Sequence, residues 1–206
     1  MTVARGRIRI RAPVNSVGAM SRTTQTRSIS NDTRTGIACS AFNLTRLGRR
    51  GLRRRVLVDQ VSVNVANARW TAIAGRPDSG AAELLRSLAG IDPVDGGRVF
   101  LAGWELSGLN DNQRRRARNL ARSQFVGPQP TPVALADAVA RALAAEPRLL
   151  FLDTIGGAVS QTVLASLRRA CTERGVTVVL ATAELPVALA ADRALVLSSG
   201  RIVEDL

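Results

Sequence analysis

Residues 70–85 have the pattern of a strand, a glycine-bracketed loop and the start of a helix, a combination that can bind phosphate. Gly75 and Gly80 are separated by four residues, which is the glycine spacing of a phosphate-binding loop. In such a loop backbone amides cradle the phosphates, the next residue is a Lys, and the one after it is a Ser or Thr that holds Mg²⁺. Ala81 and Ala82 stand in those two places here. The spacing therefore predicts the backbone cradle without its two reactive side chains.

Two acidic residues further weaken the predicted loop as a nucleotide site. Asp78 and Glu83 carry negative charge close to where phosphates would lie. One carboxylate at about 4 Å from a phosphate charge costs roughly 4 kcal/mol at an effective dielectric near 20. We expect weak ATP binding, and a tight strand-to-helix turn without a ligand explains the two glycines equally well. The candidate cofactor-binding residues are Gly75, Asp78, Ser79, Gly80, Ala81, Ala82 and, farther along the chain, Gln129.

Composition excludes several chemistries. The chain of 206 residues has a formal net charge of +13. All 29 of its Lys and Arg residues are Arg, and the chain also contains no His and no Tyr. Without His and Lys there is no imidazole base, no imidazole metal ligand and no Schiff-base amine. Cys39 and Cys171 lie far apart without metal-ligand spacing, so we expect packing thiols and no disulfide.

Arginine is concentrated in two runs, residues 46–55 and residues 114–118. One interpretation is a patch that binds nucleic acid or anionic lipid, and the other is a solvated loop and a solvated helix face. We favour the second, and regard nucleic acid as an unlikely partner, because no aromatic residues that could stack bases alternate with the arginines. Trp70 and Trp104 are expected to be packing residues.

Short apolar runs alternate with helix-length segments from Ile37 onward, which predicts an α/β fold with a mostly parallel sheet. No run approaches the roughly 20 apolar residues of a membrane-spanning helix. We expect one domain over residues 37–206 and a disordered basic tail over residues 1–36, with a transit peptide or a translation start at Met20 as alternatives. The predicted strands are 37–46, 56–65, 70–74, 98–102, 148–153, 176–181, 194–198 and 201–204, and the predicted helices are 80–89, 111–122, 134–145, 160–174 and 186–191.

Several segments in the same order resemble the ATP-binding subunit of ABC transporters, especially the lipoprotein-releasing and macrolide-exporter type. The resemblance covers the chain from about Ile37 to its end. The segments that carry it are 58–65, 84–93, 97–103, 106–111 with the following arginines, 139–153 and 191–205.

The resemblance implies a P-loop NTPase (RecA-like) core with a small N-terminal antiparallel β portion. It also implies ATP and Mg²⁺ as cofactors, a transmembrane permease and a second ATP-binding subunit as partners, and a cytoplasmic place at the membrane face.

Most functional positions of the resembled family are substituted here. Asp153 stands where the family has its Mg²⁺-associated carboxylate, but Thr154 follows in place of the Glu that polarises the attacking water. Ala183 stands at the position of the switch His, and residues 43–48 contain no aromatic residue to stack on adenine. Gln129 is the candidate for the glutamine of the family's Q-loop.

The family's helical subdomain, which ends in a Leu-Ser-Gly-Gly-Gln signature, is truncated. Only residues 130–138 separate Gln129 from the predicted helix before Asp153, and no signature is present. Since phosphoryl transfer depends on positioning and charge stabilisation, we expect no ATP hydrolysis. The alternatives are a non-catalytic regulatory or interaction module on an ABC core, a decaying gene product and, less favoured, a basic nucleic-acid-binding protein.

Overall fold

Two hydrogen-bonded sheets, with helices between and beside them, form the architecture of the computed structural model, which describes residues 36–50 and 53–206. The first sheet is antiparallel with the order β2-β1-β4-β5. It consists of β1 (Ile37–Arg50), β2 (Arg53–Ala66), β4 (Gly96–Leu101) and β5 (Trp104–Glu105). In β2 the buried residues Val61, Val63 and Val65 alternate with exposed polar ones, so one face packs on the core and the other faces water.

The second sheet is mostly parallel and has the order β10-β9-β3-β8-β7-β6. Its strands are β3 (Trp70–Ala74), β6 (Ser123–Val126), β7 (Leu149–Asp153), β8 (Thr177–Thr182), β9 (Arg193–Ser198) and β10 (Arg201–Asp205), of which only β10 is antiparallel to its neighbour. Every residue of β3, β7 and β8 is buried, as expected of central strands covered on both faces.

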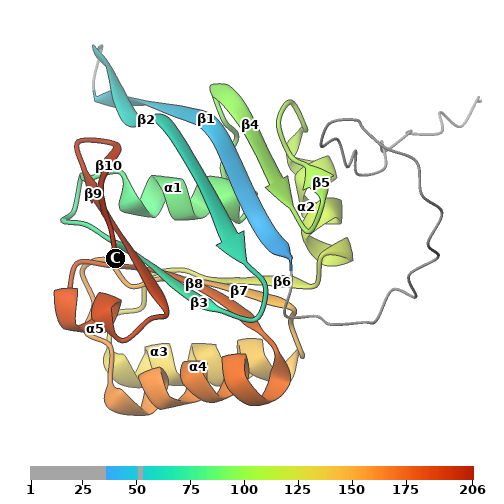
Figure 1. Cartoon of the computed structure of the whole chain (residues 1–206), viewed down its shortest axis with the longest axis vertical. Helices are drawn as coiled ribbons and strands as arrows, with labels where there is room; N and C mark the ends of the chain where they lie inside the picture. The colour runs from blue at the N-terminus through green and yellow to red at the C-terminus, as the bar shows by residue number, and fades with distance from the viewer. Residues whose placement is uncertain (1–35, 51–52) are drawn as a thin grey trace, which may run out of the picture.

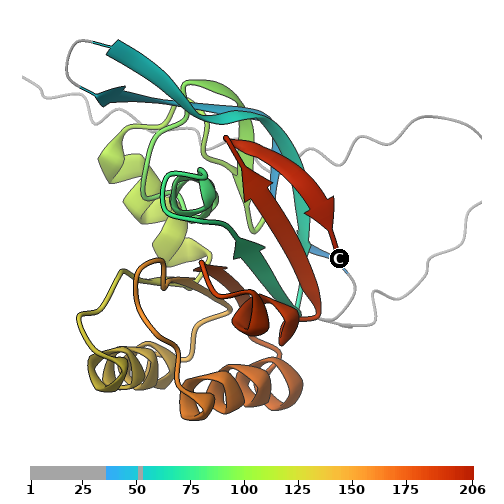
Figure 2. The same ribbon diagram turned by 90° about the vertical axis from the view of Figure 1, so that its left-hand side faces the viewer.

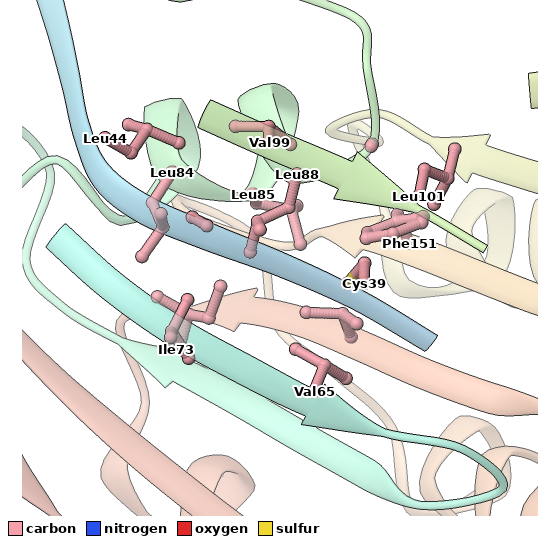
Figure 3. Close-up of a cluster of buried hydrophobic side chains, with 14 of the residues drawn as sticks. Cys39, Leu44, Val65, Ile73, Leu84, Leu85, Leu88, Val99, Leu101 and Phe151 are labelled. Carbon is pink, nitrogen blue, oxygen red and sulfur yellow. The ribbon is translucent and has the colours of Figure 1, made fainter. Parts of the chain in front are cut away.

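Helices separate and cover the sheets. They are α1 (Ala81–Leu88), α2 (Asp111–Leu120), α3 (Pro132–Ala144), α4 (Gln161–Arg174) and α5 (Leu185–Leu189). Figures 1 and 2 show α1 between the two sheets, and α3 and α4 on the opposite face of the parallel sheet. Leu84, Leu85 and Leu88 of α1 are fully buried and contact both sheets, which makes α1 the centre of the core (Figure 3).

The α/β fold class and most predicted elements are confirmed, with two strands missed. The missed strands are β5 and β6; β6 has four residues of which only Val126 is buried, so it carries almost no hydrophobic pattern. The predicted tail and Met20 lie outside the described residues, apart from Gly36. Within the described part of the chain, none of the helices is long and apolar enough to cross a membrane.

The prediction that the two arginine runs form a solvated loop and a solvated helix face is wrong in part. In the first run, residues 46–50 belong to β1 and residues 53–55 to β2, and Arg46 forms an ion pair with Asp95 at 2.7 Å. In α2, Arg114 is buried and donates to the Leu109 carbonyl, and Arg118 donates to the Gly90 carbonyl at 2.6 Å. These arginines therefore hold loops in place, because a guanidinium can satisfy carbonyls that no backbone amide reaches.

The predicted packing residues behave as expected. Cys39 and Cys171 are buried free thiols, and burial raises the pKa of Cys39 to about 12 and that of Cys171 to about 11. Trp70 is 1% exposed and Arg168 lies over its ring at 5.2 Å, while Trp104 packs against the core from β5.

Candidate functional site

The glycine-bracketed loop connects the end of β3 to the start of α1. Gly80 is the N-cap of α1 with φ 95°, and Asp78 has φ 70°, so both residues are in the left-handed region. The Gly75 amide donates to the Thr182 carbonyl at 2.9 Å, which ties the beginning of the loop to the end of β8. The loop therefore has the strand, turn and helix context that a phosphate-binding loop requires.

Two segments that are distant in the sequence pack against Gly80. A Cβ added to Gly80 would lie 2.2 Å from the Leu57 carbonyl oxygen of β2 and 3.1 Å from the Gly200 Cα, in the turn between β9 and β10. The Gly200 amide also donates to the Ser79 carbonyl at 2.8 Å. The loop conformation thus depends on contacts with both sheets.

The Ser79 side chain lies inside the loop. Ser79 is 7% exposed, and its Oγ accepts a hydrogen bond from the Ala81 amide at 3.3 Å. A Cβ added to Gly75 would lie 2.1 Å from the same Oγ, so this hydroxyl covers the first glycine. Ala81 is fully buried and Ala82 is half-buried. The amide that opens α1 is therefore paired with the loop's own hydroxyl.

Charges of both signs surround the loop. Asp78 is exposed and Glu83 is in the first turn of α1. Arg55 of β2 donates to the Asp78 carbonyl at 3.3 Å, a contact that sequence reasoning missed because 23 residues separate the two. Arg86 is paired with Asp92 at 2.9 Å.

The end of β7 carries the carboxylate and the hydroxyl singled out in the sequence. Asp153 is 4% exposed; burial raises its pKa, while a hydrogen bond from the Ile155 amide at 3.2 Å and the positive charge of Arg86 act against that rise. Thr154 is 3% exposed, and its Oγ1 donates to the Ala181 carbonyl at 2.8 Å. The Thr154 hydroxyl therefore points its proton at the backbone of β8.

The carboxyl ends of the parallel strands bring most of the predicted site residues to one edge. Ala74 pairs with Thr182, and Asp153 pairs with Ala181, so the loop, Asp153 and Ala183 are neighbours along that edge. Open parallel sheets bind ligands at this edge. Three or more His, Cys, Asp or Glu residues do not come together in a metal-binding group anywhere in the described segments.

Gln129 lies in the loop after β6, and its side-chain amide donates to the Gly127 carbonyl at 3.0 Å. A Cβ on Gly157 would lie 3.5 Å from the Gln129 carbonyl oxygen, so the segment after β7 passes close to this loop. Beyond Gln129, α3 is the one element between β6 and β7. The chain therefore runs from β6 through a loop and α3 directly into β7.

No aromatic ring occupies the part of β1 where the resembled family has one. A Cβ added to Gly48 would lie 2.6 Å from the Leu57 Cδ1, so an aliphatic side chain from β2 already covers this position.

Comparison with known proteins places these features in context. No protein-family model matches the chain. It is 33% identical over 200 residues to the aliphatic sulfonates import ATP-binding protein SsuB 2 of Frankia alni, covering 76% of this chain and 79% of that protein. It is 29% identical over 200 residues to the Fe(3+) ions import ATP-binding protein FbpC of Streptomyces coelicolor, covering 73% of this chain but only 58% of that protein.

Solved structures with the same fold are also ATP-binding cassettes. The dimeric cassette MJ0796 bound to ADP and Pi superposes with a TM-score of 0.70 at 18% identity, covering 82% of this chain and 97% of that one. The cassette cbiO1 from Clostridium perfringens gives a TM-score of 0.66 at 15% identity, covering 82% and 88% of the two chains. At these identities the likeness establishes the fold.

Proposed function

Since the chain belongs to the family of ATP-binding proteins of ABC transporters, we propose that it is a cassette subunit with a degenerate nucleotide site that does not hydrolyse ATP. The observation that carries this proposal is the hydrogen bond from Thr154 Oγ1 to the Ala181 carbonyl. A general base must accept a proton from the attacking water, whereas this hydroxyl is neutral, buried and engaged as a donor.

The loop fits the triphosphate of ATP poorly. Ala81 offers no cation to the phosphates and Ala82 no hydroxyl to Mg²⁺. The Ser79 hydroxyl accepts a hydrogen bond from the Ala81 amide, and in a phosphate-binding loop that amide would be free to bind the ligand. Asp153 is the residue that would hold Mg²⁺, and burial raises its pKa and so disfavours the charged form that binds metal. Weak binding of ATP and Mg²⁺ follows from these contacts.

We place the chain beside a competent ATP-binding subunit and a transmembrane permease at the cytoplasmic membrane face. The support for this placement is membership of the family. Because the chain spans only 58% of the iron-import relative, the partners of the whole protein are part of the proposal. The lipoprotein-releasing and macrolide-exporter type stays a prediction from the sequence segments, because relatives among the matches are named for import of iron, methionine and sulfonates.

The test is a titration of the purified chain with a fluorescent ATP analogue, with and without Mg²⁺, alongside a phosphate-release assay. We expect no saturable binding below millimolar nucleotide and no phosphate release above buffer. Release of phosphate that requires Mg²⁺ and disappears in the Asp153→Asn variant would contradict the proposal.

Restoring the two lost side chains separates binding from hydrolysis. In Ala81→Lys/Ala82→Ser we expect nucleotide affinity to rise about tenfold or more, because a hydrogen bond to a charged group contributes about 1.5–3 kcal/mol. Hydrolysis should stay absent, since Thr154 still provides no base. The same titration and phosphate assay check both expectations, with Ala82→Ser alone as the matched control. Appreciable turnover in the double variant would show that the lost base is not the limiting defect.

A further inference from the structure

A cavity lies at the edge of the parallel sheet opposite the glycine-bracketed loop. Its volume is about 480 Å³. It is lined by the starts of β1, β7 and β8, by residues just after β2 and β4, by the segments that follow α2 and α3, and by the end of α4 with the residues after it. In Figure 1 the end of α4 and the start of β1 lie at this end of the molecule. The polar residues that matter are Arg122, Glu146, Arg148, Arg174 and Thr177.

The cavity is separate from the nucleotide site. Leu149 lines the cavity at the first position of β7, and Asp153 is the last residue of the same strand. Four steps of about 3.3 Å along a strand put the two roughly 13 Å apart. A ligand in this cavity would therefore not contact the phosphate loop.

Positive charge dominates the cavity lining, with three guanidinium groups against the single carboxylate of Glu146. Arg122 donates to the Glu146 carbonyl and lies 3.7 Å from its carboxylate, and Arg174 donates to the Leu143 carbonyl at 2.8 Å. Among the residues that the structure describes, none accepts a hydrogen bond from the Arg148 side chain. Each guanidinium has five N–H donors, so most of the N–H groups of these three arginines form no hydrogen bond to the described residues.

Two of the charged residues occupy strained backbone positions. Arg122 has φ 50° after α2, and Glu146 has φ 47° after α3, whereas Gly175 fills the equivalent left-handed position after α4 with φ 64°. A residue with a Cβ costs about 1 kcal/mol in this region, and Gly is the usual occupant there. Charged side chains stand at the cavity where glycine would relieve the strain, and such strain is often found at ligand sites.

We propose that this cavity binds a small multivalent oxyanion, such as a phosphate monoester or a polycarboxylate. Guanidinium groups pair with both through two parallel hydrogen bonds. A volume of about 480 Å³ is within the range of roughly 300–1,000 Å³ typical of small-molecule sites. The inference does not depend on the proposed function, because it uses none of the residues at the phosphate loop.

The test is calorimetric titration of the full chain with three probes: orthophosphate, glucose 6-phosphate and citrate. We expect saturable binding of at least one probe, and the preferred probe distinguishes a free phosphate, a phosphate monoester and a polycarboxylate. Arg148→Ala should weaken binding about tenfold or more, since it removes a charged donor pair. Because Arg148 has no partner among the described residues, the same variant should melt at the wild-type temperature without ligand.

Two further variants control for strain and for general charge. Arg122→Gly should also weaken anion binding, while its melting temperature without ligand changes little, because relief of the positive φ offsets the lost hydrogen bond to the Glu146 carbonyl. Arg115→Ala on the exposed face of α2 removes the same charge from a residue that does not line this cavity, and should change affinity less than twofold. Absence of saturable heat with all three probes, or equal weakening in Arg115→Ala and Arg148→Ala, would overturn the proposal.

Discussion

At the scale of single residues, burial changes what Asp153 can do. The carboxyl is 4% exposed at the end of β7, and its pKa is raised above the ordinary value of 3.8. The folded protein therefore holds a proton that the unfolded chain releases, over the pH interval between the ordinary value and the raised one. Stability is greatest below that interval and falls as the pH rises through it. The ionised carboxyl is thus a cost to folding at neutral pH.

Asp153→Asn should remove that cost. We expect the variant to unfold at higher urea than wild type at pH 7, and the difference to vanish at and below pH 3.8, where the wild-type carboxyl is protonated in most molecules. Between those limits the stability difference changes by at most about 1.4 kcal/mol per pH unit, because one proton is involved. Urea unfolding from pH 3.5 to pH 8 measures it.

Asp205→Asn is the control of opposite sign. A hydrogen bond from Arg193 lowers the pKa of Asp205, so this carboxylate contributes stability at neutral pH that is lost on acidification. The variant should therefore be destabilised at pH 7 and lose that difference in acid. A destabilised Asp153→Asn at pH 7 would show that the carboxylate has a stabilising partner that burial does not reveal.

At the scale of elements, the turn into α1 is determined by its neighbours. Gly80 packs directly under the Leu57 carbonyl of β2, and the turn between β9 and β10 holds Ser79 through the Gly200 amide. These contacts with both sheets involve no phosphate and no Lys side chain. The loop conformation therefore depends on packing rather than on a bound ligand.

Gly80→Ala tests this packing. The added Cβ would lie 2.2 Å from a backbone oxygen at φ 95°, so we expect a loss on the order of 3 kcal/mol or more in the free energy of unfolding. Gly108→Ala is the matched control, with φ 75° and nothing within 4 Å of the added Cβ, and should lose only about 1 kcal/mol. Chemical denaturation of both variants measures the losses. Equal losses would mean that β2 moves aside at little cost.

At the scale of the whole molecule, the shortened connection between β6 and β7 bears on assembly. α3 alone joins these strands, and no Leu-Ser-Gly-Gly-Gln sequence is present in the chain. In the resembled family that signature completes the nucleotide site of the opposite subunit. In a dimer of this chain, each ATP would therefore lack the contacts that the signature of the opposite subunit supplies. A net charge of +13 on each copy adds repulsion between them.

We expect the chain to stay at its monomer mass of 21.9 kDa when millimolar ATP and Mg²⁺ are added. Size-exclusion chromatography with light scattering measures the mass, at 0.15 M salt so that repulsion is screened over about 8 Å. The comparison is a catalytically competent family member under the same conditions. A doubling of mass that requires ATP would contradict both this prediction and the weak nucleotide binding on which it rests.

The sequence by itself determined features that depend on chain order and local pattern. The bounds of β3 follow from its apolar run, and α1 was predicted from the glycine spacing with an error of one residue at each end. The prediction that Ala81 and Ala82 stand in the places of the Lys and the Ser or Thr rests on their position directly after Gly80, which chain order alone gives. The α/β class follows in the same way, from the alternation of apolar runs and helix-length segments.

Only the tertiary structure decided which distant groups meet. The Leu57 carbonyl over Gly80, Arg55 at the Asp78 carbonyl and the Thr154 hydroxyl at Ala181 join segments that no local pattern connects. The arginine-lined cavity likewise combines residues at or just after the ends of three helices with the starts of three strands. Strand β6 escaped prediction because its neighbour β7 and the cover of the sheet, rather than its own residues, place it. These contacts depend on packing across the two sheets, which hydrophobic periodicity along a single segment does not specify.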